Sequence, residues 1–219
     1  MINMILAVLP TILIITYILY FDRYHKEPLS LLITLFIVGC LTVIPAILLE
    51  SLLPSLNRIY SIFTLFIYSV FGIGLIEEGV KFVATKMIAF RHRAFDEIYD
   101  GIIYCVMVSL GFATIENIMY VEAYGTNVAI LRAITAVPAH TIFAVTMGYY
   151  FGLSKAFHQK RKYYLIMSLL VPVLLHGIYD FILLMALDWG MIIFGLYAFY
   201  LYKRAFKLIA TTYQIKPFK

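Results

Sequence analysis

The sequence predicts an all-α integral membrane protein, a polytopic bundle of about seven transmembrane helices. Of the 219 residues, 63% are hydrophobic and only 13% are charged, a composition that would give a soluble protein a largely apolar surface. Apolar windows of about 20 residues, the helix length that crosses a hydrocarbon core of about 30 Å, recur along the whole chain. We therefore expect residues 1–219 to form one integral membrane domain.

The first three windows cover residues 2–21, 29–53 and 60–90. The first has no positively charged segment before it and no small-residue cleavage site after it, so we expect a retained helix rather than a signal peptide. The third is longer than the bilayer requires and is expected to tilt or protrude.

The other four windows cover residues 98–123, 129–157, 163–187 and 190–208. Pro138 and Pro172 fall inside the fifth and sixth, just before His140 and one turn before His176. A proline removes a helical hydrogen bond and is expected to kink each helix there. Such kinks are tolerated in a membrane where the freed carbonyls face a wet or protein-packed cavity.

Basic residues are concentrated in alternate loops. The loops after the first, third and fifth windows and the C-terminal tail hold fourteen of them: Arg23, Lys26, Lys86, Arg91, Arg93, Lys155, Lys160, Arg161, Lys162, Lys203, Arg204, Lys207, Lys216 and Lys219. The opposite loops hold only Arg58 and Arg132. By the positive-inside rule the N-terminus lies outside and the C-terminus in the cytosol. The net charge of +5 thus reflects topology, and no nucleic-acid partner is expected beside the lipid bilayer.

Seven ionisable residues fall deep inside the predicted helices. They are Glu77, Glu78, Lys81, Glu116, His140, His176 and Asp180. A charged group near the bilayer centre costs from about 3 to more than 10 kcal/mol. A single intramembrane histidine can be a packing residue, but the summed cost of this set favours a functional site. From their positions along the helices we expect four different helices to meet in one layer of the membrane.

Spacing supports a shared site. Lys81 follows Glu77 by four residues and Glu78 by three, so it can reach both carboxylates from the same helix face. Asp180 follows His176 by four residues, where a carboxylate can hold the imidazole in one tautomer. Asn117, next to Glu116, is expected to support the site through an interhelical hydrogen bond.

Carboxylates and imidazoles without a clear serine or cysteine nucleophile point to the activation of water. In one version Glu77 and Glu78 act as general base and acid together with the histidines. In the other, His140, His176 and Glu116 bind a divalent metal such as zinc, which activates the water. The chain has no HExxH motif, and both versions stay open.

Four segments together resemble the PrsW family of intramembrane proteases. They are Glu77-Glu78-x-x-Lys81, the run from Phe95 to Gly101 that leads to Phe112-x-x-x-Glu116-Asn117, Pro138-Ala139-His140, and the run from Leu175 through His176 and Asp180 to Phe181. The loop from Phe21 to Pro28 is also similar, and chain length and helix layout agree over essentially the whole sequence.

The resemblance implies a multi-pass protease of the bacterial cell membrane. The best-known type makes the first, extracytoplasmic-side cut in RsiW, a single-span anti-sigma factor, and so starts the regulated proteolysis that releases an envelope-stress sigma factor. By the same resemblance Glu77, Glu78 and His176 carry the activity, with Glu116, His140 and Asp180 as partners in the site.

Two other classes of function share some of these features. A proton-coupled transporter or relay also gathers acids and histidines at the midplane, although such proteins tend to show internal repeats and none is evident here. A non-catalytic scaffold could use a buried polar cluster only to fix helix packing. The family resemblance favours the protease.

Overall fold

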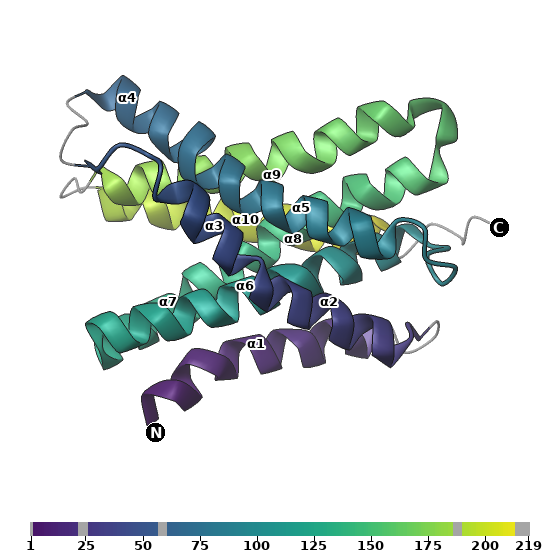
Figure 1. The fold of residues 1–219 in the computed structure, drawn as a ribbon, viewed down its shortest axis with the longest axis horizontal. Helices are drawn as coiled ribbons and strands as arrows, with labels where there is room; N and C mark the ends of the chain where they lie inside the picture. The colour runs from purple at the N-terminus through teal and green to yellow at the C-terminus, as the bar shows by residue number, and fades with distance from the viewer. Residues whose placement is uncertain (1, 22–25, 57–60, 186–189, 213–219) are drawn as a thin grey trace.

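The computed structural model describes residues 2–21, 26–56, 61–185 and 190–212, and this part of the chain contains helices and no strand. In chain order they are α1 (Ile2–Phe21), α2 (Leu29–Leu41), α3 (Val43–Glu50), α4 (Ile62–Ile67), the π-helical η2 (Tyr68–Gly74), α5 (Leu75–Ala89), α6 (Ile98–Tyr124), α7 (Thr126–Ile134), α8 (Ala136–Ala156), the 3-10 turn η3 (His158–Lys160), α9 (Arg161–Leu184) and α10 (Gly190–Thr212). The all-α prediction is confirmed (Figure 1).

These helices join into segments that correspond to the seven predicted windows. Five are long and apolar enough to cross a membrane: Leu29–Glu50, Ile62–Ala89, Ile98–Tyr124, Thr126–Ala156 and His158–Leu184. The apolar part of α1, Met4–Tyr20, is shorter, and α10 carries three basic residues. The predicted boundaries at residues 60 and 187, and the basic residues Arg23, Arg58, Lys216 and Lys219, lie outside the described residues.

The central helix of the bundle is α6, which is buried almost without interruption from Ile98 to Thr114. It packs most extensively on α8 and α2 (Figure 1). A Cβ atom on Gly101 would lie 2.7 Å from the carbonyl oxygen of Gly148 on α8. Small residues of this kind let membrane helices approach backbone to backbone, and they fix α8 against α6.

A carboxylate caps the start of α6. Asp100 is buried and its Oδ2 accepts hydrogen bonds from the backbone N–H groups of Asp96 at 2.9 Å and Glu97 at 2.7 Å. These donors would otherwise be left without partners at a helix end. The polar residues at the start of α6 therefore cap the helix and are not part of the deep polar cluster.

The two prolines behave differently from one another. α9 continues through Pro172. In the fifth window the chain breaks at Thr135, between α7 and α8, and Pro138 lies in the first turn of α8. A proline is accommodated there because the first helical N–H groups have no intrahelical partner. The irregularity predicted at Pro138 thus lies at Thr135, between α7 and α8, where the N–H of Thr135 still donates to Leu131 and its carbonyl still accepts from Ala139.

Candidate functional site

The two neighbouring glutamates lie in the first turn of α5, directly after the π-helical segment η2. Such π-helical turns within α-helices often occur at functional sites. A Cβ atom on Gly177 of α9 would lie only 2.5 Å from the Cα atom of Val70 in η2, so the two backbones are in contact. This close packing brings His176, the residue before Gly177, against the first turn of α5.

Lys81 holds the glutamate pair. Its Nζ atom lies 3.0 Å from Oε2 of Glu77, 2.9 Å from Oε1 of Glu78 and 3.2 Å from Nδ1 of His140. The lysine is 1% exposed and Glu78 is fully buried. Buried charges are stable only when they are paired and hydrogen-bonded. The expected pairing of Lys81 with both carboxylates is therefore confirmed, and the lysine also reaches α8.

His176 lies between two carboxylates. Its Nδ1 atom is 2.9 Å from Oε1 of Glu78, and its Nε2 atom is 3.3 Å from Oδ2 of Asp180. Phe143 of α8 stacks on the imidazole with ring centroids 4.8 Å apart. The ring is thus hydrogen-bonded at Nδ1 and stacked on one face. Asp180 lies within ion-pair distance of Nε2, as the spacing predicted, but its Oδ2 atom is buried with no hydrogen-bond partner among the described residues.

Glu116 of α6 joins His140 to Arg132, a basic residue expected in a loop. Its Oε2 atom lies 2.9 Å from Nε2 of His140 and 2.9 Å from Nη2 of Arg132. Arg132 Nε donates to Oδ1 of Asn117 at 3.1 Å, and Asn117 Nδ2 donates to the carbonyl oxygen of Ala7 on α1 at 2.9 Å. Asn117 is therefore the interhelical hydrogen-bonder that was expected.

The sequence pattern does not identify Arg132 as a site residue, because a single basic residue near a helix end indicates membrane topology first. It is one of two basic residues on its side of the predicted membrane, and its neighbours in α7 are mostly apolar. A lone basic residue among apolar neighbours is a pattern from which a buried ion-pair partner can be predicted. Its guanidinium also lies over the ring of Tyr120, 3.9 Å from the centroid, an arrangement that stabilises a cation through the ring electrons.

The structure brings all the predicted site residues into one contact network. The path runs from Arg132 through Glu116, His140, Lys81, Glu77 or Glu78 and His176 to Asp180. Glu77, Glu116, His140, His176 and Asp180 line a cavity of about 340 Å³. The cavity also reaches Leu131 of α7, Leu184 of α9 and Phe194 of α10. It is of the size and mixed polarity that suits a substrate site.

Four buried side chains could hold a metal ion. One donor atom from each of Glu77, Glu78, His140 and His176 lies within 4.8 Å of the others. Two imidazoles and two carboxylates are the donor types that zinc accepts in proteins. Oε2 of Glu78 is buried and has no hydrogen-bond partner among the described residues, so one carboxylate oxygen stays available, either to a metal ion or to water beside it, while Lys81 is bound. The donor set therefore fits a divalent ion.

This group differs from the metal set that the sequence suggested. His140 and His176 belong to both, but Glu116 is outside the group of four. Its Oε2 atom contacts the imidazole of His140 and the guanidinium of Arg132 instead. The physical reason is the direction of the α6 face, which turns Glu116 toward α7 and the far nitrogen of His140.

Comparison with known proteins points to the same family as the sequence motifs. The model of the PrsW family, described as intramembrane metalloprotease, matches residues 27–206. The Protease PrsW of Clostridioides difficile (strain 630) is 41% identical over 90% of this chain and 86% of its own length. The Protease PrsW of Bacillus subtilis (strain 168) is 38% identical over 84% of this chain and 83% of its own length. No solved structure matches the chain.

Proposed function

The chain belongs to the PrsW family of intramembrane metalloproteases, and from that premise we propose that it is an endopeptidase whose active site is the buried cluster around Glu78 and His176. It is a multi-pass protein of the bacterial cell membrane. The observation that carries the proposal is the free oxygen of Glu78, which is buried beside two histidines and a second carboxylate.

We assign the role of general base to Glu78. Lys81 and His176 hold its Oε1 atom, which leaves Oε2 to accept a proton from a water molecule. The water oxygen then bonds to the carbonyl carbon of the scissile peptide. When the C–N bond breaks, Glu78 returns the proton to the leaving amine. A carboxylate held in this way can act first as base and then as acid.

The remaining residues bind and orient. Asp180 places a carboxylate within ion-pair distance of Nε2 of His176, and Glu116 holds the ring of His140. A divalent ion would be held by Glu77, His140 and His176, and when bound it would polarise water or the peptide carbonyl. Three protein ligands and one open position are the usual arrangement of a catalytic zinc.

The proposed substrate is a single-span membrane anti-sigma factor similar to RsiW, cut first on its extracytoplasmic side. Support comes from the place of the cavity, whose lining includes residues of α7 and of the end of α9. In the orientation that the basic residues predict, this end of the bundle faces outward. An extended segment just outside a membrane helix could enter there.

Co-expression with a tagged single-span anti-sigma factor, read by immunoblot, tests the proposal. Wild-type protein and a Glu122→Gln control, whose side chain is exposed on α6, should both cut the substrate. Glu78→Gln and His176→Ala should be inserted in the membrane at normal levels and leave the substrate intact. Cutting by both variants at the wild-type rate would reject the assignment, and loss of cutting with a chelator would support the metal.

A further inference from the structure

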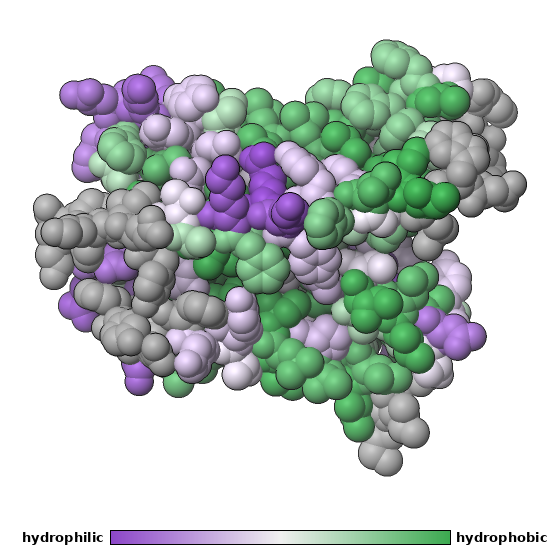
Figure 2. Space-filling view, turned by 180° about the vertical axis from the view of Figure 1, so that it is seen from behind, coloured by the Kyte–Doolittle hydropathy of each residue, from purple (hydrophilic) through white to green (hydrophobic). Residues whose placement is uncertain are grey.

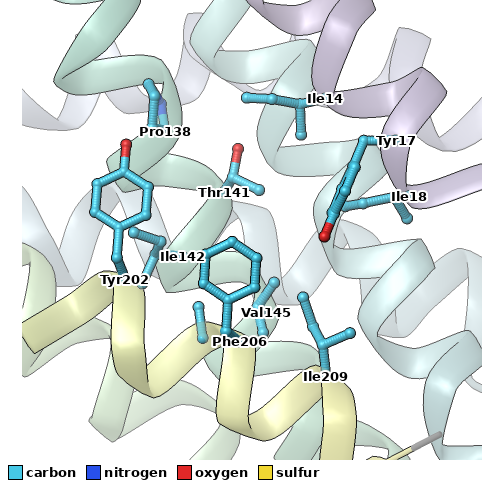
Figure 3. Close-up of a pocket in the computed structure, with 11 residues that line it drawn as sticks. Ile14, Tyr17, Ile18, Pro138, Thr141, Ile142, Val145, Tyr202, Phe206 and Ile209 are labelled. Atoms are coloured by element: carbon cyan, nitrogen blue, oxygen red, sulfur yellow. The ribbon is translucent and has the colours of Figure 1, made fainter. Parts of the chain in front are cut away.

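A polypeptide that enters a site inside the membrane needs hydrogen-bond partners for its backbone, because hydrocarbon provides none. Figure 2 shows hydrophobic and pale side chains over much of one face of the molecule, around a hydrophilic patch. A groove of about 230 Å³ between α1, α8 and α10 is lined mainly by aliphatic and aromatic residues and by no charged residue (Figure 3). The cavity of the candidate site, with its charged and hydroxyl groups, is better suited to an extended segment than this groove.

Three hydroxyl groups line the cavity of the candidate site in the described part of the chain, and two of them are engaged. Thr135 Oγ1 donates to the carbonyl oxygen of Leu131 at 2.7 Å. The hydroxyl of Tyr179, a residue that is 6% exposed, interacts with the side chain of Thr135. The hydroxyl of Tyr120 has no hydrogen-bond partner among the described residues, and Tyr120 is 40% exposed. Tyr120 is therefore the residue whose hydroxyl can bond to a molecule in the cavity.

The ring of Tyr120 is held in place on α6. The guanidinium of Arg132 lies 3.9 Å from its centroid, and that guanidinium is itself bonded to Glu116. The ring of Tyr124, one turn further along α6, lies 5.8 Å away, measured between centroids. A cation over the ring and a neighbouring aromatic side chain each stabilise its orientation. Tyr120 can thus bind a ligand with little further loss of side-chain freedom.

Acidic side chains surround the hydroxyl of Tyr120. It is within electrostatic range of Glu116, Glu77 and Asp180, which line the same cavity. Nε and Nη2 of Arg132 are bonded within the protein. Ionised carboxylates only accept hydrogen bonds, whereas each peptide unit presents both an N–H and a C=O group. The carboxylates therefore suit the N–H groups of a bound segment, and Tyr120 supplies a donor for a C=O group.

We propose that Tyr120 is a substrate-binding residue whose hydroxyl donates a hydrogen bond to a backbone carbonyl oxygen of an extended polypeptide segment in the cavity. The inference rests on the proposed function, because it takes a polypeptide as the substrate. Tyr120 holds the segment and takes no part in the proton transfer assigned to Glu78. Because the bond is made to the backbone, Tyr120 contributes affinity and register but no preference for particular side chains.

The test measures the affinity of the full-length protein in detergent for a fluorescently labelled peptide. The peptide covers the extracytoplasmic segment next to the membrane helix of an RsiW-like anti-sigma factor, and the protein carries Glu78→Gln to stop turnover. Tyr120→Phe keeps the ring beside Arg132 and removes only the hydroxyl. It should weaken binding about three- to tenfold, the effect of one hydrogen bond. Tyr124→Phe removes a hydroxyl from a residue outside the cavity lining and should leave the affinity unchanged.

A series of peptides, each with one backbone C=O replaced by C=S, locates the bond, because sulfur accepts a hydrogen bond more weakly than oxygen. With Tyr120 present, the replacement at one position should weaken binding. In Tyr120→Phe the same replacement should have no further effect, since both changes remove one interaction. Wild-type affinity in Tyr120→Phe, or the same response to every replacement in both proteins, would overturn the proposal. Cleavage of the unmodified peptide by Glu78→Gln at the wild-type rate would instead reject the proposed general base.

Discussion

Nδ1 of His176 lies 2.9 Å from Oε1 of Glu78, although the two residues are 98 positions apart in the chain. The contact depends on the close approach of η2 and α9 at Val70 and Gly177. The contact joins the buried carboxylates of α5 to a histidine of α9, so the site is shared by two helices. Lys81 completes it by bonding both glutamates and His140.

Lys81→Met should destabilise the protein strongly. The change leaves Glu77 and Glu78 buried without their cation, and removing one partner of a buried ion pair typically costs about 3–5 kcal/mol. We expect a clearly lower thermal unfolding midpoint in detergent. Lys86→Met, which removes an exposed lysine from the same helix, should leave the midpoint within error. Equal midpoints for the two variants would show that the lysine does not stabilise the pair.

Arg132→Gln should reduce substrate cleavage about 10- to 100-fold, the usual effect of losing a group that orients a site residue. Glu116 would lose the cation at 2.9 Å and hold His140 less firmly. Arg132→Lys should recover part of the activity because it restores the charge. Asn127→Ala, at an exposed position on α7, is the control. Unfolding midpoints measured in parallel separate orientation of the site from general loss of structure.

Gly177→Ala should destabilise the protein by about 1–3 kcal/mol, the range for overpacking. The added Cβ atom would meet the Cα atom of Val70 at 2.5 Å, and neither backbone can move easily. The shift would also displace His176 from Glu78. Gly195→Ala on α10 adds the same methyl group where no described atom outside the neighbouring turns of α10 itself lies within 4 Å. The comparison is made by thermal unfolding, and a matching loss in both variants would contradict the close-packing argument.

The orientation can be measured by cysteine labelling in intact cells. In a background of Cys40→Ser and Cys105→Ser, a cysteine at Asn127 should react with a membrane-impermeant maleimide added outside. A cysteine at Lys160 should react only after the cells are opened. The reverse pattern would place the cavity rim on the cytosolic side and exclude an extracytoplasmic cut.

The sequence alone determined that the fold is helical, and it identified the ionisable residues that lie deep inside the apolar windows. Apolar windows specify helices because a membrane leaves no other partner for backbone polar groups. The cost of deep charges singled out Glu77, Glu78, Glu116, His140, His176 and Asp180. Spacing within one helix also gave the pairs Lys81 with the glutamates and His176 with Asp180, because residues three or four apart share a face.

Only the tertiary structure decided which helix faces meet. Periodicity gives the face of a residue on its own helix but not the rotation of that helix in the bundle. Hence the pairing of Glu78 with His176, and of Glu116 with His140 and Arg132, could not be read from spacing. The close contact of Val70 with Gly177 places α9 against η2, and this packing of residues distant in the chain decides which side chains meet in the site.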